Sequence, residues 1–214
     1  ETQVAEVFRS RAGGFAANNL SKFLEQKTDG LRMSSEFARK HGLETIWTLR
    51  MNDIHDNWHP HLGPRFKKEH PELLLFQPDD IGRERASADW PEPHMLATAV
   101  DYGHKAIQDR QFAIIEDVCR RYEIDGIELD LLRQPYLFRP TIEGRPCEAE
   151  HLDIFTGFVR RVRDMTEDIG RKRDRPLLIS CRVPSRIECC RAIGIDVERW
   201  VADDLIDVLV SAME

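Results

Sequence analysis

The sequence lacks the features that define several classes of protein. It has no run of about twenty apolar residues, which a membrane-spanning helix needs. Lys and Arg number 31 against 38 Asp and Glu, and the net charge of −7 argues against a nucleic-acid partner. The five cysteines are odd in number and lack the spacing of a zinc site or a disulfide framework, so we expect reduced, mostly buried thiols. The sequence starts at Glu1 without a signal-like apolar segment, which leaves the compartment open.

A strand in the middle of the chain carries two carboxylates. Between residues 126 and 131 apolar and polar positions alternate, which is the period of a β-strand, and Glu128 and Asp130 are on the polar side. A long amphipathic helix precedes the strand, as in a βα unit, where both faces of the sheet are covered. Because burying unpaired charges costs several kcal/mol, the polar face must open onto a wet cavity. In a β/α barrel this is the active-site mouth at the carboxyl ends of the strands, where Asp130 lies.

Polar side chains end other strands in the same way. Three further segments have a strand pattern, at residues 45–52, 177–183 and 206–211. The last polar residues of the three clearest strands are Arg50 and Asn52, Glu128 and Asp130, and Ser180 and Arg182. If these strands are parallel neighbours, the six side chains converge on one mouth, and two guanidiniums beside Asp130 favour its ionised form. The alternative is a structural ion-pair layer inside the barrel.

The rest of the chain is predicted to alternate helices and loops. Helical patterns occur at residues 36–41, with Ser34 or Ser35 as the N-cap, from 101 or 103 to 121, at 148–169 and at 196–202. The connection from 53 to 97 has one helical candidate, 64–74, and its length indicates a functional loop over the carboxyl-terminal face. The fold class is α/β, with residues 1–214 as a single domain. A barrel has eight strands in about 250 residues, so four strands predict an incomplete barrel, a fragment of a longer chain, with further short strands in the first thirty residues as the alternative.

Residues 121–135 read Arg-Tyr-Glu-Ile-Asp-Gly-Ile-Glu-Leu-Asp-Leu-Leu-Arg-Gln-Pro. This segment resembles the glycosyl-hydrolase-like barrel families, in which a helix ending in Arg-Tyr leads to a strand with an Asp-Gly-Ile-x-x-Asp core and then Arg-x-Pro. Residues 101–110 and the Lys-Lys-Glu-His-Pro-Glu segment at 67–72 are also similar to elements of these families. The resemblance covers about half of the chain. It implies a TIM-like (β/α)8 barrel, a glycoside hydrolase or glycoside-hydrolase-like protein acting on a poly- or oligosaccharide.

The resemblance also implies catalytic residues. Asp130 matches the strand-end acidic residue, and Glu128 is the nearest candidate for the second carboxylate that glycoside cleavage needs. Residues two apart on a strand lie about 6.6 Å apart along it and do not face each other across a sugar ring. A partner from another segment is better placed, and the candidates are Asp53, Glu188, Glu214 and a residue outside this fragment.

Sugar binding needs flat apolar surfaces beside hydrogen-bonding groups. Trp58, Tyr136 and Trp90 are candidates for stacking on pyranose faces, with ordinary loop packing as the alternative. The polar candidates for substrate binding are Arg50, Asn52, Asp53, His55, Arg133 and Arg182. We expect a carbohydrate substrate, while the sugar, its linkage and the oligomeric state are left open.

Two other functions stay open at this point. A non-catalytic carbohydrate-binding barrel would keep the aromatic and strand-end polar residues without a positioned acid. A metal-dependent hydrolase would bind zinc through His55, His59 and His61. The His59–His61 pair lies in a loop and is interrupted by a proline, whereas ligand pairs of this kind usually end a strand. We therefore expect no metal and no cofactor.

Overall fold

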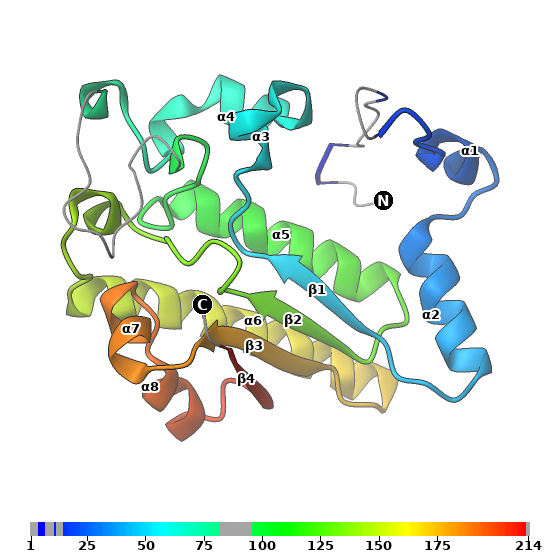
Figure 1. Ribbon diagram of the computed structural model, residues 1–214. Coiled ribbons are helices and arrows are strands. Elements are labelled where there is room, and N and C mark those ends of the chain that lie inside the picture. Colours follow the sequence, from blue (N-terminus) through cyan, green and yellow to red (C-terminus); the bar gives the residue numbers. More distant parts are fainter. Residues whose placement is uncertain (1–3, 7–10, 12–14, 82–95, 213–214) are drawn as a thin grey trace.

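The computed structural model describes residues 4–6, 11, 15–81 and 96–212, which form an α/β fold around one parallel sheet (Figure 1). The four strands lie in the order β1, β2, β3, β4, as in the chain. Their bounds are Ile46–Arg50, Gly126–Asp130, Leu178–Pro184 and Val208–Ala212. All neighbours are parallel, so the carboxyl ends of the strands meet at one edge of the sheet. The four predicted strands are confirmed.

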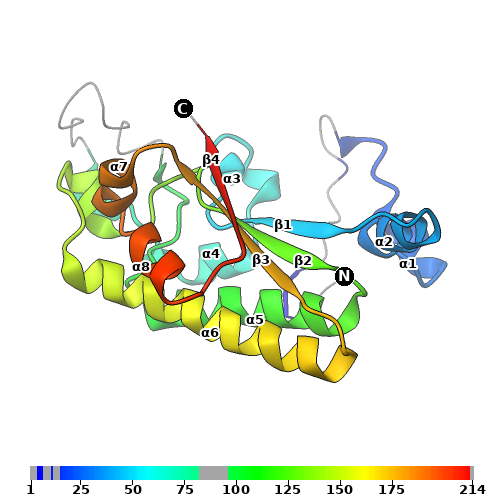
Figure 2. The same cartoon turned by 90° about the horizontal axis from the view of Figure 1, so that it is seen from below.

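Two long helices, α5 (Lys105–Arg121) and α6 (Ala149–Arg173), run along one face of the sheet (Figure 2). The shorter helices are α1 (Leu20–Glu25), α2 (Gly30–Lys40), α3 (His55–Trp58), α4 (Arg65–Glu69), α7 (Ile187–Ala192) and α8 (Val197–Ala202). Single 3-10 turns occupy Pro60–Leu62, Pro71–Leu73, Pro78–Asp80 and Arg139–Glu143. Helices α5 and α6 each connect one strand to its parallel neighbour, as parallel pairing requires.

The hydrophobic core lies between the sheet and the two long helices. The buried strand residues on this face are Ile127, Leu129, Ile179, Cys181 and Val183. The helix residues in the same cluster include Ile115 and Val118 of α5 and Phe155, Val159 and Val162 of α6. The period-2 apolar side of each strand therefore meets the apolar stripe of each helix.

The opposite face of the sheet carries polar side chains in two rows. In the first row the register places Thr48, Glu128 and Ser180 side by side. In the second row, at the carboxyl edge, it places Arg50, Asp130 and Arg182 side by side. Because α5 and α6 both lie against the apolar face, neither helix covers these rows (Figure 2).

The connection from β1 to α5 is more ordered than the sequence indicates. The described part of the predicted loop 53–97, residues 53–81 and 96–97, contains α3, α4 and the 3-10 turns that begin at Pro60, Pro71 and Pro78, and Leu74 forms an antiparallel bridge with Val100. The predicted helix 64–74 was too long, since α4 ends at Glu69 and a separate turn begins at Pro71, which has no backbone N–H to continue the helix. The described part of this connection lies beyond the carboxyl ends of the strands (Figure 1).

Other helix boundaries also differ from the prediction. Helix α2 begins at Gly30 rather than near residue 36, because the Asp29 side chain accepts a hydrogen bond from the Arg32 N–H at 2.9 Å and caps the helix. Ser34 and Ser35 therefore lie inside α2 and do not cap it. Helix α6 runs four residues past Ile169, to Arg173. Helix α7 was not predicted.

The described residues form an open four-stranded sheet and not a closed barrel. The structure therefore shows a parallel α/β fold, and the expected (β/α)8 barrel stays a prediction. The assignment of residues 1–214 to a single domain stays a prediction. Two residues named from the sequence, Trp90 and Glu214, lie outside the described residues. Within the described ranges, every helix is too short or too polar to cross a membrane.

Candidate functional site at the carboxyl edge of the sheet

Asp130 is the last residue of β2 and is held in place by three groups. Its side chain is 7% exposed. Oδ1 accepts hydrogen bonds from the backbone N–H groups of Leu132 and Arg133, both at 3.2 Å. The Arg182 guanidinium donates to the two carboxylate oxygens at 3.3 Å and 3.5 Å. The carboxylate therefore has a fixed orientation at the end of the strand.

Arg50 does not bind Asp130, although the two are partners in the β1–β2 register. Its guanidinium lies 3.1 Å from Oδ2 of Asp53 instead. The expectation of two guanidiniums beside Asp130 is therefore met by Arg182 alone. Since Arg50 is at the open end of its strand, its long side chain can turn toward the segment that follows β1.

Asp53 and His55 form a pair just after β1. Nδ1 of His55 lies 2.9 Å and 3.0 Å from the two oxygens of Asp53, and the His55 backbone N–H donates to Asp53 at 3.0 Å. Partial burial by itself would raise the pKa of Asp53, but the hydrogen bonds from His55 and Arg50 outweigh it and leave this pKa below its usual value. Asp53 is therefore the ionised partner of both side chains.

Glu128 lies one row deeper than Asp130, and its two carboxylate oxygens accept hydrogen bonds from hydroxyl groups. Thr48 donates to Oε1 at 3.3 Å and Ser180 donates to Oε2 at 3.2 Å. Both carboxylates project from the same strand, as the alternation predicts, and so do not oppose each other. Of the other candidates for a second carboxylate, Glu188 on α7 has a side chain that is 80% exposed and near Arg186, at 3.9 Å.

Asn52 binds the backbone of two segments that lie next to the carboxyl ends of the strands. Its Nδ2 donates to the carbonyl oxygens of Val100 and Tyr136, at 3.0 Å and 2.9 Å, and its Oδ1 accepts from the Val100 N–H at 3.0 Å. The residue is 2% exposed. These bonds use both amide hydrogens, so Asn52 holds the backbone of the site together, and its role as a substrate contact stays a prediction.

The aromatic and basic candidates differ in accessibility. Trp58, at the end of α3, is 51% exposed. Tyr136 is half-buried and packs against a small apolar cluster that includes Ile54 and Leu75. Arg133 is exposed directly after the strand end. Trp58 and Arg133 are thus free to contact a ligand, whereas much of the Tyr136 ring is used in packing.

The loop histidines do not form a metal site in the described part of the chain. The rings of His59 and His61 lie 5.7 Å apart, and Nδ1 of His55 is bonded to Asp53. No group of three or more His, Cys, Asp or Glu in the described ranges has an arrangement that could hold a metal ion.

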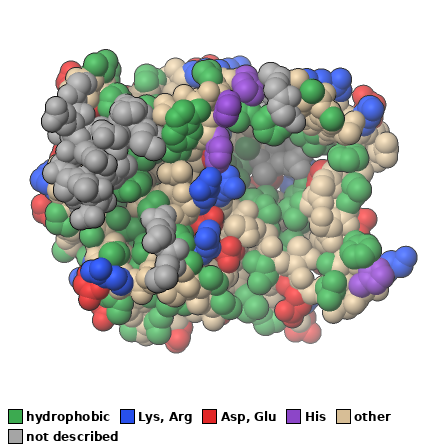
Figure 3. Space-filling view, viewed as in Figure 1, with side chains coloured by type: hydrophobic (Ala, Val, Ile, Leu, Met, Phe, Trp, Pro, Cys, Tyr) green, Lys and Arg blue, Asp and Glu red, His purple; other side chains and the backbone are tan. Residues whose placement is uncertain are grey.

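A cavity of about 700 Å³ opens beside β1, between the N-terminal segment, α4 and α5. Arg50, Asp53, His55 and Lys67 are among its lining residues. Figure 3 shows a hollow in this face of the molecule, with basic, acidic and histidine side chains gathered beside it.

Lys67 was given no role from the sequence, although its amine donates to the carbonyl oxygen of Asp53 at 2.7 Å and to Asp56 at 3.1 Å. Burial lowers the pKa of Lys67, and Asp56 opposes this only in part. No pattern in a five-residue helix distinguishes a buried lysine from an exposed one.

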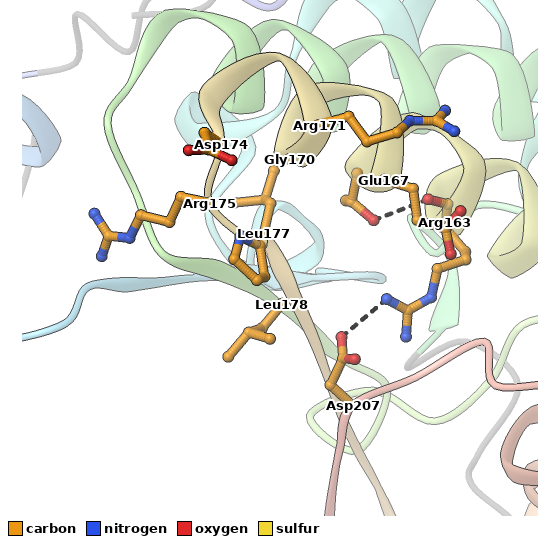
Figure 4. A pocket seen from close by; sticks show the side chains of 11 residues that line it. Arg163, Glu167, Gly170, Arg171, Asp174, Arg175, Leu177, Leu178 and Asp207 are labelled. Atoms are coloured by element: carbon orange, nitrogen blue, oxygen red, sulfur yellow. Dashed lines mark hydrogen bonds and ion pairs between the residues drawn. The ribbon is translucent and has the colours of Figure 1, made fainter.

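A second cavity, of about 420 Å³, lies at the other end of the sheet, between the end of α6 and the start of β3 (Figure 4). The ion pair of Arg163 with Asp207, at 3.1 Å, is on its wall. Asp207 also accepts a hydrogen bond from the Ile179 N–H at 2.7 Å, so the pair attaches α6 and the start of β4 to β3. In α/β barrels this amino-terminal end contributes stability and the carboxyl end carries the chemistry.

No family model and no curated protein matches the sequence. Among solved structures, the chain is similar to the galactosidase domain of alpha-galactosidase-sucrose kinase, AgaSK, with 14% sequence identity and a TM-score of 0.39. The match covers 73% of this chain and 18% of that chain.

Proposed function

We propose that this chain belongs to a glycoside hydrolase or a related sugar-binding barrel that acts on a poly- or oligosaccharide through its strand-end carboxylates. The observation that carries the proposal is the fixed Asp130 carboxylate, held by Arg182 and two backbone N–H groups at the carboxyl edge of a parallel sheet. The Asp-Gly-Ile-x-x-Asp motif that ends at Asp130 and resembles the glycosyl-hydrolase-like families supports it.

The proposed roles of these residues follow from the charge that develops on the sugar during glycoside cleavage. The anomeric carbon becomes positively charged in the transition state, so an oriented carboxylate can stabilise or attack it. Arg182 and the two N–H groups hold the Asp130 carboxylate in one orientation. Arg50, Asp53, Arg133 and Trp58 lie at the same edge or just after it and are the proposed sugar contacts.

Replacing Asp130 with Asn tests this proposal, because Asn keeps the shape of the side chain and removes its negative charge. We expect Asp130→Asn to abolish the release of reducing sugar from a panel of oligosaccharides while the variant still binds them. Glu198→Gln, which changes an exposed carboxylate on α8, is the matched control and should leave turnover unchanged. Unaltered turnover in Asp130→Asn would remove the catalytic assignment, and a full chain that binds several sugars but cleaves none would be a binding module.

A further inference from the structure

The Asp53–His55 pair has the geometry of an oriented proton-transfer group. An Asx turn just before α3 accounts for the bond from the His55 backbone N–H to Asp53, two residues earlier. It does not require the second bond, in which the His55 ring meets both carboxylate oxygens at 2.9 Å and 3.0 Å through Nδ1. A carboxylate that accepts from Nδ1–H fixes the tautomer of the ring and leaves Nε2 as the nitrogen that exchanges a proton.

His55 also lines the cavity of about 700 Å³ beside β1, which lies in the size range of small-molecule sites, roughly 300–1,000 Å³. The cavity wall combines the apolar Phe15 and Leu62 with polar groups, as a sugar-binding surface requires.

Arg50 connects this cavity to Asp130. It lines the cavity, binds Asp53 through its guanidinium, and is the register partner of Asp130 through its backbone. His55, at the start of the helix α3 that follows β1, and Asp130, at the end of β2, therefore lie after or at the ends of two neighbouring strands. Glu128 and Asp130, on one strand, cannot oppose each other in this way.

We propose that the cavity beside β1 binds the leaving-group side of the saccharide and that His55, oriented by Asp53, donates the proton to the leaving oxygen. This inference rests on the proposed function. As Oδ2 of Asp130 bonds to the anomeric carbon, the bond from that carbon to the leaving oxygen breaks. Its electron pair stays on the oxygen, which takes the Nε2 proton of the doubly protonated His55 ring and leaves that ring as the Nδ1–H tautomer. Water then gives a proton back to Nε2 while its oxygen bonds to the anomeric carbon and releases the Asp130 carboxylate.

Leaving groups of different acidity test the role of His55. In the full chain, His55→Gln should lower kcat/KM for oligosaccharides by about 10²–10⁴-fold, the usual contribution of a general acid. The same variant should keep the wild-type kcat/KM for 2,4-dinitrophenyl glycosides, because that leaving group needs no proton. His59→Gln is the matched control, since His59 is not among the described residues that line the cavity, and it should keep both values. Equal losses on the two substrates, or no loss on either, would overturn the assignment.

A second measurement needs no sugar. Long-range ¹H–¹⁵N spectra should show neutral His55 as the Nδ1–H tautomer, and Asp53→Ala should return it to the Nε2–H tautomer that free histidine favours. An Nε2–H tautomer in the wild type would overturn the inference and leave the Asp130 proposal standing. If Asp130→Asn keeps full turnover, or no glycoside is cleaved, the catalytic assignment of Asp130 fails and the inference fails with it, whatever the tautomer.

Discussion

Lys67 and Asp56 form an ion pair that is almost out of contact with water, with side chains 14% and 7% exposed. Removing one partner leaves the other charge buried without compensation, so Asp56→Ala should lower the free energy of unfolding by about 3–5 kcal/mol in urea denaturation. The double variant Asp56→Leu with Lys67→Met should recover most of this loss. A single variant as stable as the wild type would show that water reaches Lys67.

The loss in Asp56→Ala should also depend on pH. In the folded protein the pKa of Lys67 is below the value of 10.5 for an unperturbed lysine. Between these two pKa values the unfolded chain binds more protons than the folded one, so the free energy of unfolding increases as the pH rises. Without Asp56 the pKa of Lys67 in the folded protein is further below its unfolded value. The difference in the free energy of unfolding between the wild type and Asp56→Ala should therefore shrink between neutral pH and about pH 9.

The polar residues of the candidate site could be predicted from the sequence where they lie within a strand. Alternation places Glu128, Asp130 and Arg182 on one face, and parallel register then brings the last two together. Side chains after a strand end have no such period. The contacts of Arg50 and Asn52 with residues of the following segment, and the burial of Lys67, therefore appear only in the folded structure.

The Asp-Gly-Ile segment at the start of β2 has a structural explanation at the level of the element. A Cβ at Gly126 would lie 2.9 Å from the carbonyl oxygen of Leu178, its partner on β3. The preceding Asp125 accepts a hydrogen bond from the Thr45 N–H at 2.7 Å and pairs with Arg175. Glycine thus permits the close approach of β2 and β3, and Asp125 joins the starts of three strands.

A single methyl group at this position should disturb the sheet. We expect Gly126→Ala to lower the free energy of unfolding by about 1–3 kcal/mol, because β2 and β3 must move apart. Gly157→Ala, in α6, is the matched control. No atom lies within 4 Å of the added Cβ, and alanine favours a helix by roughly 0.5–1 kcal/mol, so this variant should be more stable than the wild type. Thermal melts followed by circular dichroism would compare them, and equal destabilisation of both variants would contradict this account.

The strands and the two long helices were predictable because each has a repeated pattern over many residues. Helix α3 has four residues, too few for a 3.6-residue period to show, and α7 was missed although α8, also of six residues, was predicted. Capping by Asp29 decided the start of α2, where two serines offered an equally good local signal.

At the scale of the whole molecule, all five cysteines are free, and their exposure differs. Cys189 is exposed, whereas Cys119, Cys181 and Cys190 are buried, and burial raises the pKa of Cys119 to about 12. We expect Cys189 to react first with a thiol reagent in the native protein, and the buried three to react only as the chain unfolds. Cys189→Ser should remove the fast phase, and reducing agent should leave the melting temperature unchanged. A fast phase that survives in Cys189→Ser would indicate that the core opens without unfolding.

The parallel sheet joins segments that are far apart in the chain. Thr48 and Glu128 are separated by 80 residues, and Asp130 and Arg182 by 52. Such contacts form only after long loops have closed, which is slow compared with the formation of a helix. Asp130 and Arg182 therefore meet only after β3 has been synthesised and has paired with β2. Partly folded forms of this protein can contain its helices while the candidate site is still unassembled.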